Sequence, residues 1–171
     1  MQNTKRLAIG AMFLAIMLVI GYIEYQIPTG VPGIKLGLSN SVLLLSLYWL
    51  GIPFSLGLML SKVFLSGFLF GNPNAMIYSL SGGALSMLGM IVAIYLLKGV
   101  SCIGAGVIGA VLHNVGQVAV AMWQLNTTKL IYYMAILMLV GIVTGLVTGN
   151  VCKQLIRYLP KSRRERFFKT E

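Results

Sequence analysis

Six long apolar runs divide the chain, and this pattern constrains its fold more than any other feature. Clusters of proline, glycine and asparagine, which favour turns or helix caps, separate the runs. A bilayer core about 30 Å thick requires roughly 20 apolar residues for each spanning helix, so 171 residues allow six spans with short connections. We therefore predict an all-α integral membrane protein, a compact bundle of six transmembrane helices. The spans are expected near Leu7–Ile27, Leu36–Leu50, Pro53–Phe70, Ala75–Leu97, Val100–Gln124 and Leu130–Cys152.

The composition agrees with lipid as the main solvent. The chain is 58% hydrophobic and 9% charged, which is too little polar surface to cover a soluble globule of this size. Its net charge of +10 is concentrated at the two ends instead of along a soluble face with interleaved aromatic residues, so nucleic acid is not an expected partner. We predict one transmembrane domain over residues 1–160 and a basic cytoplasmic tail over residues 161–171, which would lie on anionic membrane lipid.

Basic residues at both ends predict the orientation in the membrane. Lys5 and Arg6 precede the first apolar run. Seven more basic residues follow or end the last run: Lys153, Arg157, Lys161, Arg163, Arg164, Arg166 and Lys169. The positive-inside rule therefore places both termini in the cytoplasm, in a multi-pass protein of the plasma membrane with an even number of spans. The second predicted span is short and follows a Pro/Gly loop, so the first outer loop is expected to dip toward the membrane.

Acidic residues are too few for several classes of enzyme. The chain has no aspartate, and its glutamates are Glu24, Glu165 and Glu171. Magnesium-dependent ionisation of diphosphates and paired-carboxylate hydrolysis both need several carboxylates, and no phosphate-binding loop for ATP is present. Cys102 and Cys152 are interpreted as small packing residues. We expect no enzymatic activity, no metal and no cofactor.

Three ionisable residues are predicted inside the membrane, namely Glu24, Lys62 and His113. A charge at mid-bilayer costs about 3 kcal/mol, so each should face the protein interior or water. We predict that Lys62 binds an anionic group of a solute, with a structural ion pair as the alternative. His113 and Gln117 share one helix face and Asn114 is adjacent, which fits either ligand binding or hydrogen bonding between helices.

Small residues follow the faces of two predicted spans. Ala8, Ala11 and Ala15 lie along one face of the first span, and such faces let another helix approach closely. This stripe could pack inside the chain or dock a separate membrane partner. Glycines of the fifth span, including Gly106 and Gly109, are expected to pack within the chain.

The segment Pro32–Asn40, which follows a span ending at Tyr22–Glu24, resembles the Gx transporter family, historically labelled heptaprenyl diphosphate synthase component I. The resemblance covers nearly the whole chain. That family is similar in size, span number and layout to the S components of energy-coupling-factor (ECF) transporters. The resemblance implies binding of a vitamin-like solute from outside, with an ECF transmembrane coupling subunit and two ATPase subunits as partners. S components dock through an Ala-x-x-x-Ala face on the first helix, and Ala11–Ala15 matches it.

Together these features predict an S-component-like solute-binding subunit of an ATP-driven importer. Its solute is expected to be small, anionic and partly apolar, such as a vitamin or an isoprenoid or quinone precursor. The candidate binding residues are Glu24, Lys35, Asn40, Lys62, Asn72, Asn74, His113, Asn114 and Gln117.

Two alternatives stay open at the level of sequence. The chain could be a non-catalytic membrane subunit associated with isoprenoid diphosphate or quinone synthesis, with a partner supplying the catalytic acids. It could instead be a stand-alone secondary transporter that uses His113 or Glu24 as a proton site. Copurifying partners, or transport without ATP, would distinguish the three functions.

Overall fold

A computed structural model describes residues 2–26, 39–71, 73–97 and 99–158. This part of the chain contains six α-helices, one short π-helix and no strand, which confirms the all-α prediction. Five of the helices are long and apolar enough to cross a membrane, so the chain is a multi-pass membrane protein. The elements are α1 (Gln2–Gln26), α2 (Ser39–Trp49), α3 (Ile52–Leu69), α4 (Pro73–Ile91), η1 (Val92–Leu96), α5 (Cys102–Gln124) and α6 (Leu130–Ile156).

The turn residues lie between the helices, at the positions that the sequence pattern predicts. Gly51 has a φ of 90°, in the left-handed region that favours glycine, and it forms the N-cap of α3. Pro53 follows in the first turn of that helix, where its missing N–H is tolerated. Gly99 lies between η1 and α5 with a φ of 98°. The six predicted spans therefore correspond one to one with the six α-helices.

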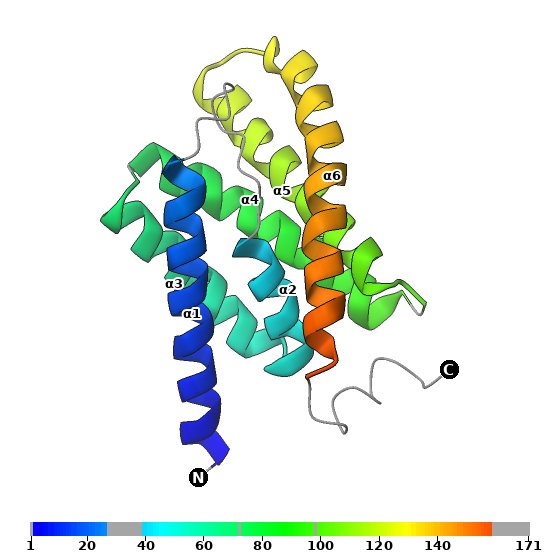
Figure 1. Cartoon of the computed structure of the whole chain (residues 1–171). Coiled ribbons are helices and arrows are strands. Elements are labelled where there is room, and N and C mark those ends of the chain that lie inside the picture. Colours follow the sequence, from blue (N-terminus) through cyan, green and yellow to red (C-terminus); the bar gives the residue numbers. More distant parts are fainter. Residues whose placement is uncertain (1, 27–38, 72, 98, 159–171) are drawn as a thin grey trace.

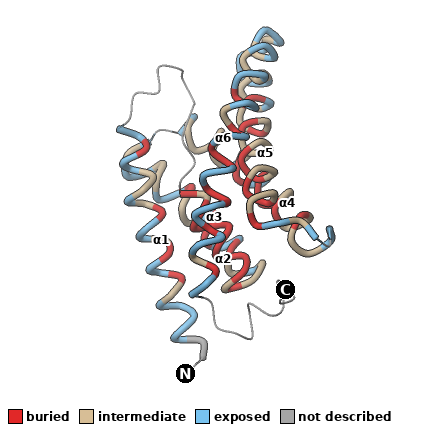
Figure 2. Tube along the Cα trace, turned by 45° about the vertical axis from the view of Figure 1, so that its right-hand side comes forward, coloured by how far each residue is buried: buried red, intermediate tan, exposed pale blue. Residues whose placement is uncertain are grey.

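Helix α2 is too short to cross a bilayer by itself. Its 11 residues extend about 16 Å, against a hydrocarbon core of about 30 Å. The predicted second span began at Leu36, and residues 36–38 lie outside the described part of the chain. Residues 41–48 of α2 are all buried, and the helix packs against α1, α3, α5 and α6 (Figure 2). A helix that is apolar on every side is expected at the centre of a bundle.

Both ends of α2 are held inside the bundle. Its first residues lie part-way along α1 and α6 instead of at an end of the molecule (Figure 1). Toward its C-terminal end, the Ser46 hydroxyl is 2.7 Å from the Ser55 hydroxyl of α3, and the Tyr95 hydroxyl of η1 donates to the Leu47 carbonyl at 2.8 Å. The amides of a helix N-terminus have no intrahelical acceptor, so the opposite end of α2 needs polar partners.

Helices α5 and α6 approach closely through glycine. A Cβ atom at Gly106 would lie 2.8 Å from the Gly145 carbonyl oxygen, and one at Gly145 would lie 2.5 Å from the Cα of Val107. Such contacts leave no room for side chains, which confirms that the glycines of the fifth span pack within the chain. Cys102 and Cys152 are buried, as expected of small packing residues.

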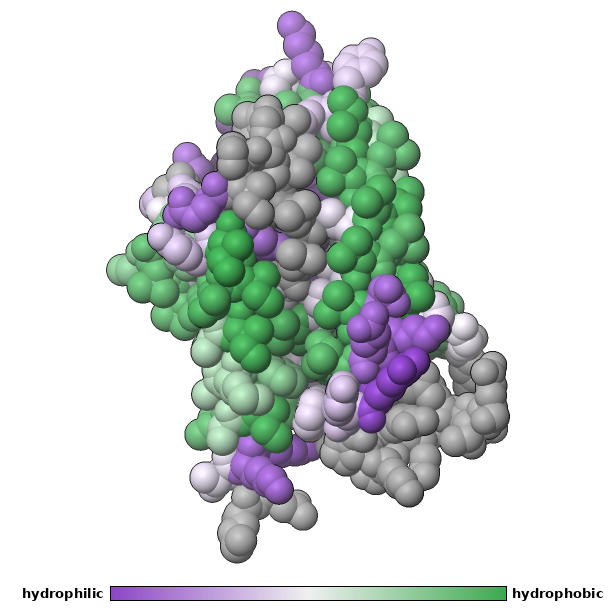
Figure 3. All heavy atoms as spheres, in the orientation of Figure 1, coloured by the Kyte–Doolittle hydropathy of each residue, from purple (hydrophilic) through white to green (hydrophobic). Residues whose placement is uncertain are grey.

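The outer surface fits a lipid environment. Figure 3 shows hydrophobic residues along the flanks of α1 and α6 and hydrophilic residues toward the two ends of the molecule. The start of α1 and the end of α6 lie at the same end of the bundle (Figure 1), as an even number of crossings requires. The basic residues predict that this end lies on the cytoplasmic face of the membrane.

Cysteine labelling tests this orientation. In a variant carrying Cys102→Ala and Cys152→Ala, a membrane-impermeant maleimide should label Asn126→Cys, between α5 and α6, in intact cells. It should label Thr4→Cys, near the start of α1, only after permeabilisation. The reverse pattern would invert the orientation, and labelling of both positions from outside would contradict an even number of crossings.

Candidate functional site

Charged and polar side chains from three helices meet at the N-terminal end of α2. The Ser39 hydroxyl donates to Oε2 of Glu24, on α1, at 3.3 Å. The ammonium of Lys62, on α3, donates to the Ser39 hydroxyl at 2.7 Å and to Oδ1 of Asn40 at 3.0 Å. Ser39 thereby links a carboxylate to an ammonium group. Three of the residues predicted to bind solute are therefore neighbours.

These hydrogen bonds explain how the charged side chains of Glu24 and Lys62 can lie inside an apolar bundle, where an isolated charge is costly. Glu24 and Ser39 are buried, and the bonds of Lys62 are partly buried. Buried charges are tolerated when they are paired and hydrogen-bonded, and Ser39 serves both partners at once. The first amides of α2 add partial positive charge at the same point. Ser39 and Asn40 therefore give these two charged side chains hydrogen-bond partners within the protein.

The cluster lines a cavity of about 60 Å³ inside the bundle. Helices α4, α5 and α6 contribute Ser86, His113, Asn114 and Thr144 to its opposite wall. Ser86 is buried, and its hydroxyl has no hydrogen-bond partner within the described residues. An unsatisfied buried hydroxyl costs about 1–3 kcal/mol, so the cavity favours a polar occupant.

The polar cluster predicted on the fifth span has two local roles. The Asn114 amide donates to the Leu137 carbonyl of α6 at 2.7 Å, so it ties two helices together. Nε2 of His113 lies 3.0 Å from Nε2 of Gln117, on the same helix face as predicted. His113 and Asn114 also line the cavity, whereas Gln117 is not among its lining residues.

The other predicted solute contacts lie outside the cavity or outside the described part of the chain. Asn74 is exposed in the first turn of α4 and is not among the cavity-lining residues. Lys35 and Asn72 fall on residues that the structure does not describe. Sequence reasoning did not identify Ser39 or Ser86, because a serine inside an apolar run carries no signal of its own. Only the position of Ser39 beside Asn40, at the start of the short second run, could have indicated it.

The alanine stripe of α1 faces away from the bundle. Ala8, Ala11 and Ala15 are exposed, whereas Phe13 and Gly10 on the other side of the helix are buried. A Cβ atom at Gly10 would lie 2.6 Å from the ring of Phe54, so α1 uses this second face to pack on α3. The stripe therefore takes no part in packing within the described residues.

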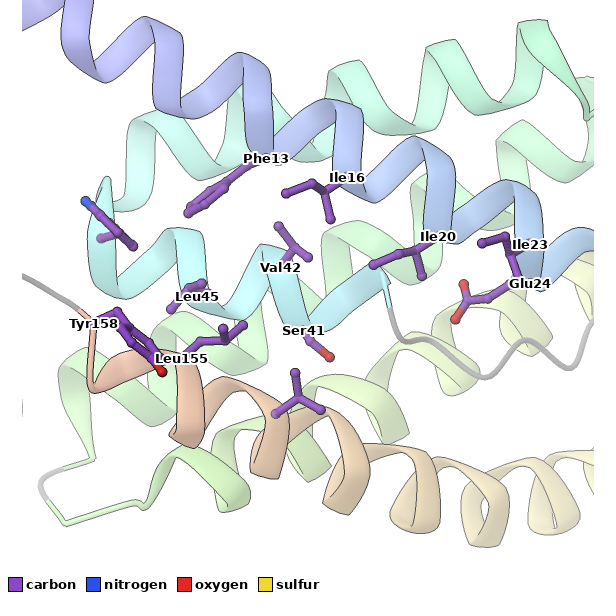
Figure 4. A pocket seen from close by; sticks show the side chains of 12 residues that line it. Phe13, Ile16, Ile20, Ile23, Glu24, Ser41, Val42, Leu45, Leu155 and Tyr158 are labelled. Carbon is purple, nitrogen blue, oxygen red and sulfur yellow. The ribbon is translucent and has the colours of Figure 1, made fainter.

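A second, apolar hollow lies beside the polar cavity. It is a groove of about 640 Å³ between α1 and α6, with α2 as its floor (Figure 4). Glu24 lines both the groove and the polar cavity. Glu24 therefore lies between the groove and the polar cavity.

Comparison with protein families identifies the chain. The family described as "Heptaprenyl diphosphate synthase component I" matches residues 13–155. The chain belongs to this family. Its membership confirms the resemblance drawn from the segment Pro32–Asn40, while the similarity to ECF S components stays a prediction. Comparison with curated proteins and with solved structures finds no match.

Removal of the Asn114 amide tests whether this residue is structural. The variant Asn114→Ala loses the bond to the Leu137 carbonyl, so its stability should fall by about 0.6–2 kcal/mol, measured by thermal unfolding in lipid nanodiscs. Asn150→Ala, at an exposed asparagine of α6, is the control and should unfold like the wild type. An Asn114→Ala protein of unchanged stability would show that the bond to α6 contributes nothing to the fold.

Proposed function

We propose that this family member is the solute-binding membrane subunit of an ATP-driven importer, similar in role to an ECF S component. The observation that carries the proposal is the ammonium of Lys62, held by Ser39 and Asn40 at the wall of a cavity inside the bundle. A charge in the interior of a membrane protein generally belongs to a substrate or ion site.

The chemistry of the cluster favours a solute with an acidic group. The Lys62 ammonium is a hydrogen-bond donor, and Lys62 lines the same small cavity as Ser86. A bound anion would receive charge-assisted hydrogen bonds worth about 1.5–3 kcal/mol each, which corresponds to roughly ten- to hundredfold in affinity.

The outward alanine face of α1 supports docking to a membrane partner. Small side chains permit close helix contact, and this face is left uncovered within the described residues. The partner proposed is an ECF transmembrane coupling subunit carrying two ATPase subunits. Those subunits would supply ATP hydrolysis, since this sequence has no phosphate-binding loop.

A second candidate function is a non-catalytic membrane subunit in isoprenoid diphosphate synthesis. The family description and the apolar groove beside Glu24 both favour a long hydrocarbon substrate. A partner would then provide the catalytic carboxylates. Copurification distinguishes the two functions, because ATPase subunits support the importer and a soluble prenyl synthase supports the second candidate.

Bulky substitutions on the alanine face test the docking surface. The double variant Ala11→Trp/Ala15→Trp should fold normally but lose its copurifying ATPase subunits, because two indole rings would hold the helices apart. The control is Leu139→Trp/Val143→Trp, which places the same spacing of tryptophans on exposed positions of α6. If the α1 variant kept its ATPase subunits, the alanine face would not be the docking surface, and if it lost its fold instead, the face would belong to packing within the chain.

Removal of one charge tests the solute site. Native mass spectrometry of the purified protein should show a retained solute, and Lys62→Met should weaken its binding by about tenfold or more, because the ammonium that binds the acidic group is gone. Lys153→Met, at an exposed lysine of α6, should bind as the wild type does. Unchanged affinity of Lys62→Met would exclude the solute role, and loss of folding would assign Lys62 to an internal pair.

A further inference from the structure

One polar side chain in the lining of the polar cavity is not explained by packing. Ser86, on α4, is 1% exposed, and its hydroxyl has no hydrogen-bond partner within the described residues. The hydroxyls of Thr144 and Ser66 also belong to the lining, but each donates to a backbone carbonyl of its own helix at 3.2 Å. Buried hydroxyls are rarely left without a partner, so Ser86 indicates a polar occupant of the cavity.

The size of the cavity restricts this occupant. Its volume of about 60 Å³ is roughly the space that two molecules of liquid water take up. A carboxylate places two oxygen atoms in such a space, whereas a phosphate group has more oxygens and a diphosphate more still. The described cavity therefore has room for a carboxylate or for two water molecules, and it is too small for a diphosphate.

The charges in the lining restrict the occupant further. Among the described lining residues, the side chains that can ionise are Glu24, Lys62 and His113. The Gln117 amide nitrogen can only donate, and it lies 3.0 Å from Nε2 of His113, so this ring nitrogen is the acceptor and the imidazole is neutral. Lys62 and Glu24 then contribute one charge of each sign, and the described lining has no net charge.

A singly charged anion suits this balance better than a multiply charged one. A carboxylate brings one negative charge, whereas a phosphate monoester brings about −1.5 to −2 at pH 7. Lys62 is the one cation in the described lining, and the Glu24 carboxylate lies one serine away from it. Additional negative charge would therefore stay uncompensated in the interior of the bundle, where it is costly.

We infer that the acidic group of the solute is a single carboxylate, which binds in the polar cavity and accepts hydrogen bonds from Lys62 and Ser86. The inference rests on the proposed solute site at Lys62, and it adds a second donor and a choice of acid to that site. It gives the Ser86 hydroxyl the partner that the described residues do not provide. A diphosphate, which the second candidate function requires, fits neither the volume nor the charge of the cavity.

Three probes that share one ethyl group test the choice of acid. Propionate, ethyl phosphate and ethyl diphosphate are titrated into the full-length wild-type protein in phosphatidylcholine nanodiscs at pH 7 and constant ionic strength. Binding is followed by saturation-transfer NMR of the ethyl protons, with empty nanodiscs as the reference. Propionate should bind about tenfold or more tightly than either phosphate compound, because its charge and size match the cavity.

The variant Ser86→Ala tests the second donor, and Ser41→Ala is its matched control. Both serines are buried and neither hydroxyl has a partner within the described residues, but Ser41 is not among the residues that line the polar cavity. Ser86→Ala should weaken propionate binding by about tenfold, because a hydrogen bond to a charged group is lost, while its unfolding temperature does not fall. Ser41→Ala should bind propionate as the wild type does.

The variant Lys62→Met separates this inference from the proposed function. It should weaken all three probes, because each of them is an anion. If it weakened them all but ethyl diphosphate bound the wild type most tightly, the solute site would stand and the carboxylate assignment would be overturned. If Lys62→Met weakened none of them, the proposed solute site itself would be wrong.

Two further results would overturn the inference by themselves. Equal affinity of Ser86→Ala and the wild type for propionate would show that Ser86 does not contact the acid. If propionate did not bind the wild-type protein above the level of empty nanodiscs, the cavity would hold water only.

Discussion

The buried N-terminal end of α2 is the feature on which the rest of the arrangement depends. In lipid, each backbone polar group must find a partner within the protein or in a water-lined space. Because α2 is 11 residues long and begins part-way along α1 and α6, its first turn lies inside the bundle. Ser39 and Asn40 therefore meet Lys62, and Ser39 meets Glu24, at a depth where neither charge would be stable alone.

The faces of helix α1 differ in what they contact. Gly10 packs on α3, Phe13, Ile16 and Ile20 line the groove, and the alanine face that includes Ala11 is exposed. Near its C-terminal end, Glu24 lies between the polar cavity and the apolar groove. A docked partner on the alanine face would thus contact the same rigid helix that borders both hollows.

Much of the fold followed from the sequence because lipid imposes strong rules on a chain. The apolar runs predicted six helices in order, and Gly51 and Pro53 predicted where α3 begins. The site was harder to predict. Glu24, Lys62 and His113 stood out because charge and histidine are rare in apolar runs, and all three line the cavity. Ser39 and Ser86 did not stand out, because a serine carries no charge and its role is visible only once its neighbours in the fold are known.

The sequence by itself determined the membrane class, the helix order and the family, because each depends on local hydropathy, turn residues or matched positions along the chain. Tertiary structure alone decided that the alanine stripe faces outward, that Asn114 binds the α6 backbone, and that a groove adjoins the polar site. The physical reason is that helices of similar hydropathy can pack in many rotations. Close contacts such as Gly106 on Gly145 select one rotation, and only then is it decided which side chains share a space.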